Sequence, residues 1–156
     1  MERTQLSQAL WDHRAAMMRL AMSILRHPQD AEDAVSAAME KAFRSIAALK
    51  DDGAFAPWVM RITANACYDL MRRRKREREY VQGMVQELFT QPQEGGLMEV
   101  ILTLPKGTAQ VLTLFYYENF STADIAQILR IPGAAVRMRL SRGRRLLRAA
   151  LEEENG

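Results

Sequence analysis

Two clusters of arginine carry the strongest chemical signal in this sequence, and both have the chemistry to bind phosphate. The first cluster lies within residues 72–78 and the second within residues 137–148, about 60 residues later. Guanidinium groups form paired hydrogen bonds with phosphate oxygens and with guanine edges. A single basic run is as often a solvated helix face. Two separate runs, each ending a helical pattern, favour contact with nucleic acid.

The charge of the chain is distributed in blocks that its net value of +3 conceals. Residues 61–79 carry seven basic and three acidic groups, and residues 132–156 carry six and three. The two remaining stretches, 1–60 and 80–131, have net charges of −1 and −3. Separated positive blocks are the electrostatic pattern of proteins that contact a phosphate backbone.

A helix-turn-helix pattern positions the second arginine cluster. Ser121 begins a capped helix with Asp124 three residues later, residues 131–133 form a tight turn, and a long basic helix covers about residues 134–152. The first residues of such a second helix reach base edges in the major groove, and later ones reach phosphates. The side chains placed at bases or phosphates are Ala134, Ala135, Arg137, Met138, Ser141, Arg142, Arg144, Arg145 and Arg148. The alternative is a helical hairpin whose arginines only keep it soluble.

Another amphipathic helix leads into the first arginine cluster. Its predicted apolar face holds Phe55, Val59, Ile62, Ala66 and Leu70. Arg61, Asn65 and Asp69 are four residues apart and therefore share another side of the helix. Such a side can hydrogen-bond to DNA bases while the arginines that follow contact phosphate.

The remaining helices follow from apolar residues at intervals of three and four. We expect a helix over residues 4–26, a break at Pro28, and a second helix with Asp30 as its N-cap. In the second half, a short helix ends at Pro105 and another covers residues 108–117. The inward residues of that helix are predicted to be Val111, Leu112 and Phe115.

The fold class that these patterns predict is all-α, because no strand-like alternation of useful length occurs. We expect two small helical domains, residues 1–78 and 97–156, of which the second contains the helix-turn-helix. Residues 79–96 are rich in polar residues and helix breakers, which predicts a linker.

The sequence offers little for catalysis or for a metal. Cys67 is the one cysteine, which excludes an intramolecular disulfide, and we interpret it as a packing residue. His13 and His27 are too few for a histidine-built zinc site. We expect no enzyme activity, no cofactor and no metal. With no apolar run of about 20 residues and no signal peptide, we expect a cytoplasmic protein without membrane insertion.

Two runs of residues resemble the two conserved domains of extracytoplasmic-function sigma factors of bacterial RNA polymerase. The first run is Asp30-Ala31-Glu32-Asp33-Ala34-Val35, followed by Phe55, Trp58-Val59, Arg61-Ile62, Asn65-Ala66, Asp69-Leu70 and Arg72-Arg73. The second is Leu104-Pro105, then residues 111–114, 121–129 and 131–132, then Val136-Arg137, residues 139–144 and Leu147. The resemblance covers nearly the whole chain in order.

This resemblance implies a subunit that directs core polymerase to promoters and opens them locally. Core polymerase would bind through the clamp helices of its largest subunit and the flap of its second-largest subunit, and an anti-sigma factor is a further implied partner. The implied clamp-binding residues are Asp30, Glu32, Asp33, Ser36 and Glu40. The minus-ten element and an everted base would contact the loop of residues 50–55 and Asn65, Asp69, Arg72, Arg73 and Arg76. The minus-thirty-five element would contact Arg137, Met138, Ser141, Arg142 and Arg145.

The chain departs from the family pattern at several of these positions. Ser36-Ala37 replaces Gln-Glu on the core-binding helix, Ala64 replaces an arginine, and Ala135 and Met138 replace hydroxyl residues of the recognition helix. We therefore expect a different promoter preference. Two alternatives remain: a sigma-like helix-turn-helix regulator without core binding, and a mimic that sequesters an anti-sigma factor. A pure mimic has no need of the arginines in residues 72–78.

Overall fold

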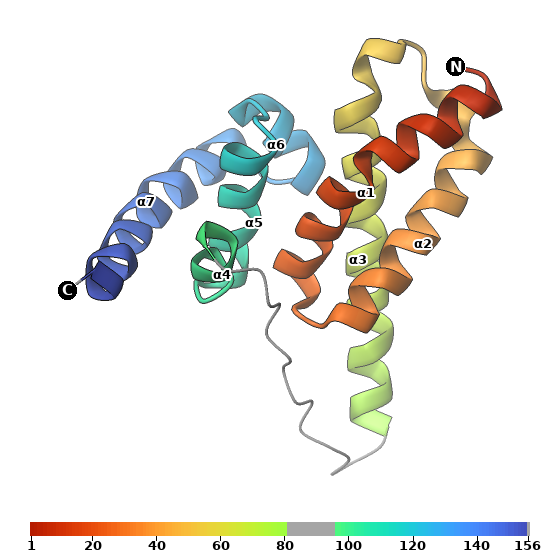
Figure 1. The fold of residues 1–156 in the computed structure, drawn as a ribbon. Helices are drawn as coiled ribbons and strands as arrows, with labels where there is room; N and C mark the ends of the chain where they lie inside the picture. Colours follow the sequence, from red (N-terminus) through yellow and green to blue (C-terminus); the bar gives the residue numbers. More distant parts are fainter. Residues whose placement is uncertain (81–95, 156) are drawn as a thin grey trace.

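The computed structural model describes residues 1–80 and 96–155, and these form helices joined by short turns, with no strand among them (Figure 1). The first half holds α1 (Arg3–Leu25), α2 (Pro28–Ser45) and α3 (Phe55–Tyr80), with 3-10 turns at Ile46–Ala48 and Asp52–Ala54. The second half holds α4 (Leu97–Ile101), α5 (Lys106–Leu112), a π turn (Thr113–Tyr117), α6 (Thr122–Leu129) and α7 (Gly133–Asn155). The predicted all-α fold in two helical parts is confirmed. Most of the predicted linker, residues 81–95, lies outside the described residues.

The start of α2 differs from the prediction. His27, and not Asp30, is the N-cap, and its Nδ1 accepts a hydrogen bond from the Asp30 backbone N–H at 3.3 Å. Pro28 occupies the first helical position, where its fixed φ suits the helix and its missing N–H costs nothing. Asp30 therefore lies inside the first turn, and its side chain is buried.

The buried face of α3 is rotated from the predicted one. Ile62 and Ala66, which the sequence places on the apolar face, pack at the edge of the core and are only half-buried, on the side of α3 toward α2. Elements of both halves pack on α3, which moves its buried arc toward the second half. Cys67 is fully buried, and burial raises the pKa of its thiol to about 12. The buried residues of α3 are Phe55, Val59, Met60, Thr63, Ala64, Cys67 and Leu70.

The two halves pack against each other, with α1 and α3 facing α5 and α6 (Figure 1). Among the described residues, three polar contacts join them. The Arg19 guanidinium pairs with Glu118 at 2.6 Å, and the Tyr68 hydroxyl donates to Gln110 Oε1 at 2.9 Å. The Arg26 guanidinium donates to the backbone carbonyl of Leu104. The apolar core is continuous through both halves. The two predicted domains are therefore docked against each other in this structure.

The π turn after α5 changes which side chains point inward. Val111 and Leu112 are buried as predicted, but Leu114 is buried next to them while Phe115 is only half-buried. A π turn has more residues per turn than an α-helix, so the inward positions shift along the sequence. The prediction of a regular helix to residue 117 is wrong for this last turn.

Gly143 permits the close crossing of α7 over α5. A Cβ atom at this position would lie 2.9 Å from Thr108 Cγ2 and 3.0 Å from Leu112 Cδ1, and both neighbours are buried. Contacts this short force the packed side chains to move. The second half therefore depends on a glycine that helix propensity alone would disfavour.

We expect Gly143→Ala to destabilise the protein. Overpacking costs about 1–3 kcal/mol, which exceeds the gain of about 1 kcal/mol that alanine gives inside a helix. Urea unfolding followed by circular dichroism measures the difference. Gly133→Ala is the matched control, because only the Arg137 guanidinium lies near its Cβ, at 3.4 Å. A Gly143→Ala protein as stable as the parent would contradict this packing.

Candidate nucleic-acid interface

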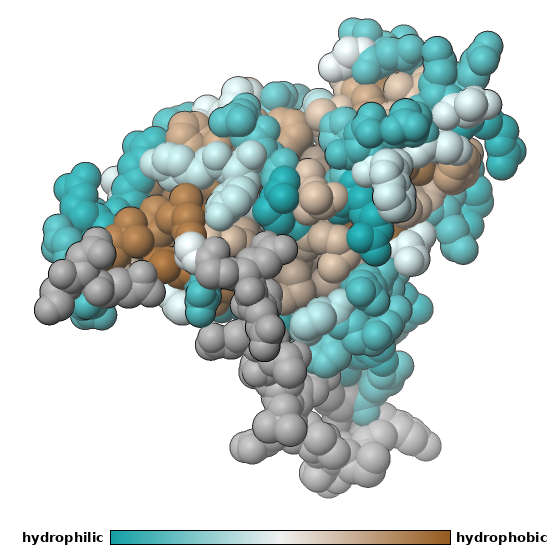
Figure 2. Space-filling view, in the orientation of Figure 1, coloured by the Kyte–Doolittle hydropathy of each residue, from teal (hydrophilic) through white to brown (hydrophobic). Residues whose placement is uncertain are grey.

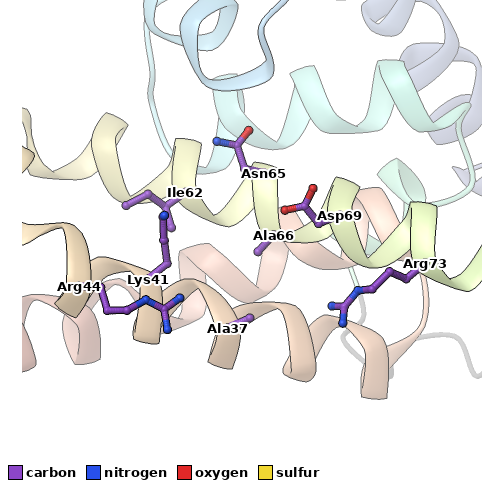
Figure 3. Close-up of a pocket in the computed structure, with 8 residues that line it drawn as sticks. All are labelled: Ala37, Lys41, Arg44, Ile62, Asn65, Ala66, Asp69 and Arg73. Atoms are coloured by element: carbon purple, nitrogen blue, oxygen red, sulfur yellow. The ribbon is translucent and has the colours of Figure 1, made fainter.

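A pocket of about 310 Å³ lies between α2 and α3, on the side of α3 that continues into the first arginine cluster (Figure 3). Its residues come from three turns of α3 and two of α2, because positions three and four apart share a helix face. The lining residues are Ala37, Lys41, Arg44, Ile62, Asn65, Ala66, Asp69 and Arg73.

The pocket combines a cationic wall with hydrogen-bonding groups. Lys41 extends from α2 toward α3, and Arg73 reaches from α3 back toward α2 (Figure 3). Asn65 and Asp69 project outward along α3 at the other rim. Its cations outnumber its single carboxylate, so the pocket favours an anionic ligand. Phosphate on one side and a base edge on the other fit this arrangement.

Two of these cations, Lys41 and Arg44, are absent from the sequence-based set of site residues. With Ala37 they repeat at intervals of four and three on α2, which is the signal that could have identified them. The predicted base-capturing loop, in contrast, does not line the pocket. Phe55 begins α3 ten residues before Asn65, which separates the two positions by about 15 Å along the helix axis.

The arginines that follow on α3 divide into two groups. Arg74 is bound to α2 through Asp30 at 3.1 Å and to Glu77 at 3.2 Å. The hydrogen bond to Glu77, followed by the charge of Asp30, raises the pKa of Arg74. Arg74 therefore fixes the extension of α3 against α2, a role that its place in the cluster did not indicate.

Arg72, Arg73 and Arg76 of this extension face solvent, and the lower end of α3 is covered by hydrophilic side chains (Figure 2). Arg72 forms an ion pair with Asp69 on the helix surface. This pair orients Arg72 and occupies one oxygen of the Asp69 carboxylate. Arg73 and Arg76 are exposed, so the structure leaves them accessible to phosphate.

Four of the five residues implied in core binding share an exposed face of α2. They are Glu32, Asp33, Ser36 and Glu40. The fifth, Asp30, is buried and directed to Arg74, so in this arrangement its carboxylate holds α3 and does not face outward. The acidic face lies beside the cationic pocket, on the neighbouring side of the same helix.

The helix-turn-helix has the geometry that the sequence predicts. Ser121 Oγ accepts a hydrogen bond from the Asp124 backbone N–H at 3.1 Å, which caps α6. Arg130 ends α6 in the left-handed region with a φ of 55°, and α7 begins at Gly133. The apolar residues of α6 predicted to lie inward, Ile125, Ile128 and Leu129, are all buried.

The first turns of α7 present the predicted contact residues to solvent. Val136, Leu140 and Gly143 lie on the buried side. Leu147 and Leu151 are half-buried, so the predicted inner stripe weakens toward the end of the helix. The exposed residues are Ala134, Arg137, Met138, Ser141, Arg142 and Arg145, while Ala135 is half-buried.

Arg144 differs from the neighbouring arginines of α7 because two side chains of the π turn contact its guanidinium. Its Nε–H donates to the Tyr116 hydroxyl at 2.9 Å, and its guanidinium lies 5.5 Å from the Phe115 ring centroid. These contacts attach α7 to the π turn. The predicted phosphate contact of Arg144 therefore competes with a structural one.

Within residues 1–80 and 96–155, no group of three or more His, Cys, Asp or Glu side chains is placed to hold a metal ion. None of the helices described there combines the length and the apolar character needed to span a bilayer.

Two family models match the chain, one for each half. The model of sigma-70 region 2 matches residues 11–77, and that of sigma-70 region 4 matches residues 95–147. Together they include α3 as far as residue 77, the pocket, the helix-turn-helix and the contact residues of α7.

Individual relatives and a solved structure agree with these matches. The chain is 28% identical to the probable RNA polymerase sigma factor RfaY of Xanthomonas campestris, over 85% of this chain and 36% of that one. It is 25% identical to the RNA polymerase sigma factor SigV of Bacillus subtilis, over 92% and 89%. The fold matches the sigma factor RpoE of Bartonella quintana, solved in complex with the anti-sigma factor NepR. That match has a TM-score of 0.80 and 24% identity, and covers 95% of this chain and 97% of that one.

Proposed function

We infer that this chain, which belongs to the extracytoplasmic-function group of the sigma-70 family, directs RNA polymerase core to promoter DNA and opens the promoter locally. The main support for this function is that each of the two helical halves presents a cationic face. One is the pocket between α2 and α3 with the exposed arginines after it, and the other is the outer face of α7. Its site of action is the cytoplasm, where the polymerase works.

Each face suits a different form of DNA. The outer face of α7 has the shape and charge for the major groove of duplex DNA, so it binds the minus-thirty-five element. The pocket has room and polar groups for a strand whose bases are unstacked, so it binds the minus-ten element as it opens. Asn65 and Asp69 offer hydrogen bonds to a base, and Arg72, Arg73 and Arg76 bind the backbone.

The exposed acidic face of α2 serves the polymerase. Glu32, Asp33, Ser36 and Glu40 lie together there, free of the buried core. A face of this kind binds a basic partner surface and speeds the encounter. Because it adjoins the pocket, a polymerase bound to α2 lies next to the strand that the pocket receives.

The docked arrangement of the halves cannot serve both promoter elements at once. The elements are about 25 base pairs apart, which is about 85 Å of duplex. A compact chain of this length has a radius of gyration of about 15 Å. The halves must therefore separate in the working complex, which breaks the contacts of Arg19 with Glu118 and of Tyr68 with Gln110.

Binding to purified core polymerase tests the function and separates it from its alternatives. We expect the wild-type protein to bind core polymerase. The double variant Glu32→Lys Glu40→Lys should bind at least tenfold more weakly, because placing like charges against each other across an interface costs several kcal/mol. Asp12→Lys is the matched control, because Asp12 is an exposed acid on a different helix, α1. Competition with a labelled sigma factor for core measures the affinities. A wild-type protein that binds promoter DNA but not core would identify a stand-alone regulator.

A further inference from the structure

The first turns of α7 carry a large apolar side chain, Met138, among the cations of their outer face. Met138 is 61% exposed, although α7 buries other apolar residues on its inner side. Single exposed apolar side chains are normal on protein surfaces, so exposure alone assigns no role. The position of Met138 on the helix is what points to a role.

Met138 lies at the middle of the outward arc of α7. Successive residues of an α-helix are rotated by about 100°, which places Met138 nearly opposite the buried Val136, Leu140 and Gly143. Arg137 and Ser141 flank it on one side and Arg142 on the other. A recognition helix directs the outer arc of its first turns at base edges in the major groove, so Met138 faces the floor of the groove with arginines on both sides.

The floor of the major groove has one apolar feature among the four natural bases. This feature is the 5-methyl group of thymine, and all the other groups presented there are hydrogen-bond donors and acceptors. A methionine side chain is unbranched and polarisable, so it adapts to a small apolar partner. It has no strong donor or acceptor with which to read another base.

We propose that Met138 selects thymine in the upstream promoter element by packing against its 5-methyl group. This inference rests on the proposed function, because it requires α7 to enter the major groove. The neighbouring arginines supply affinity through phosphates and guanine, and Met138 supplies the preference for thymine at one position.

Replacing thymine by deoxyuridine tests the proposal, since the replacement removes only the methyl group. The holoenzyme first selects its upstream element from a pool of randomised duplexes, and each thymine of the selected duplex is then replaced in turn. At one position we expect the wild-type holoenzyme to lose about fourfold in affinity, the amount that one buried methyl contributes. Met138→Ala should bind the thymine and deoxyuridine duplexes equally. Leu146→Ala, which removes another exposed apolar side chain of α7, should keep the wild-type ratio.

The outcomes distinguish this proposal from the function on which it rests. A selected element without thymine, or equal binding of thymine and deoxyuridine duplexes by the wild type, would overturn the role of Met138. A Met138→Ala protein that keeps the fourfold preference for thymine over deoxyuridine would also overturn this role. If Arg137→Ala Arg142→Ala binds as well as the wild type, α7 does not enter the groove and the function of the helix itself is wrong.

Discussion

Replacing Arg137 and Arg142 by alanine is expected to cause a large loss of affinity for the upstream promoter element. Both side chains are exposed on the outer arc of the first turns of α7. A bidentate contact to a base contributes about 1–3 kcal/mol, so each replacement should weaken binding roughly 5- to 150-fold. Fluorescence anisotropy of the holoenzyme on labelled duplexes measures this loss.

Binding to core polymerase should be unchanged in the same double variant, because α7 is remote from the acidic face of α2. Arg14→Ala is the matched control, since Arg14 is an exposed cation of α1 outside both DNA faces. An equal loss of affinity for every DNA sequence would show that the two arginines contact phosphates and read no base.

Replacing Arg44 and Arg73 by alanine is expected to impair promoter opening more than recruitment. These two residues supply much of the positive charge of the pocket between α2 and α3. The salt dependence of binding is the slope of log affinity against log salt concentration. Losing two contacts to single-stranded phosphate should reduce the magnitude of this slope by about 1.4. Binding of the holoenzyme to preformed bubble DNA at several salt concentrations measures this slope.

Asn65→Ala provides the contrast within the same pocket. An amide carries no charge, so its loss should weaken bubble binding while leaving the salt slope at the wild-type value. Lys106→Ala, which removes an exposed cation at the start of α5, should change neither quantity. If the arginine variant kept the wild-type slope, the pocket would not be a binding site for the DNA backbone.

Local patterns were enough to predict the helices and the helix-turn-helix. The Ser121 cap, the buried residues of α6 and the continuation of α3 into the arginine cluster follow from spacing within single elements. These features depend on contacts a few residues apart, which the sequence displays directly.

Most of the predictions that failed depend on contacts between elements. The inward face of α3 is set by the packing of both halves on one helix, which rotates Ile62 and Ala66 toward α2. The start of α2 is an exception, because it depends on a local cap in which a histidine competes with a more usual aspartate. The inclusion of Lys41 and Arg44 in the pocket depends on where α2 lies against α3. Periodicity in one helix contains no information on its partner.

The sequence also could not show which arginines are held by other side chains of the protein. Arg74 and Arg144 look like their neighbours in an arginine cluster, yet Asp30 and Tyr116 hold them in place. An arginine committed to a structural contact is less available to DNA than an exposed one. Only the tertiary arrangement separates these two groups.

Permanganate footprinting of promoter DNA tests the central claim most directly, because it detects unpaired thymines. With the wild-type protein and core polymerase together, we expect reactive thymines around the minus-ten element, and none with either component alone. Arg44→Ala Arg73→Ala should reduce this reactivity while the upstream element stays bound. Promoter DNA that remains fully paired with wild-type protein and core, although both are bound, would contradict the assignment of the first half to promoter opening.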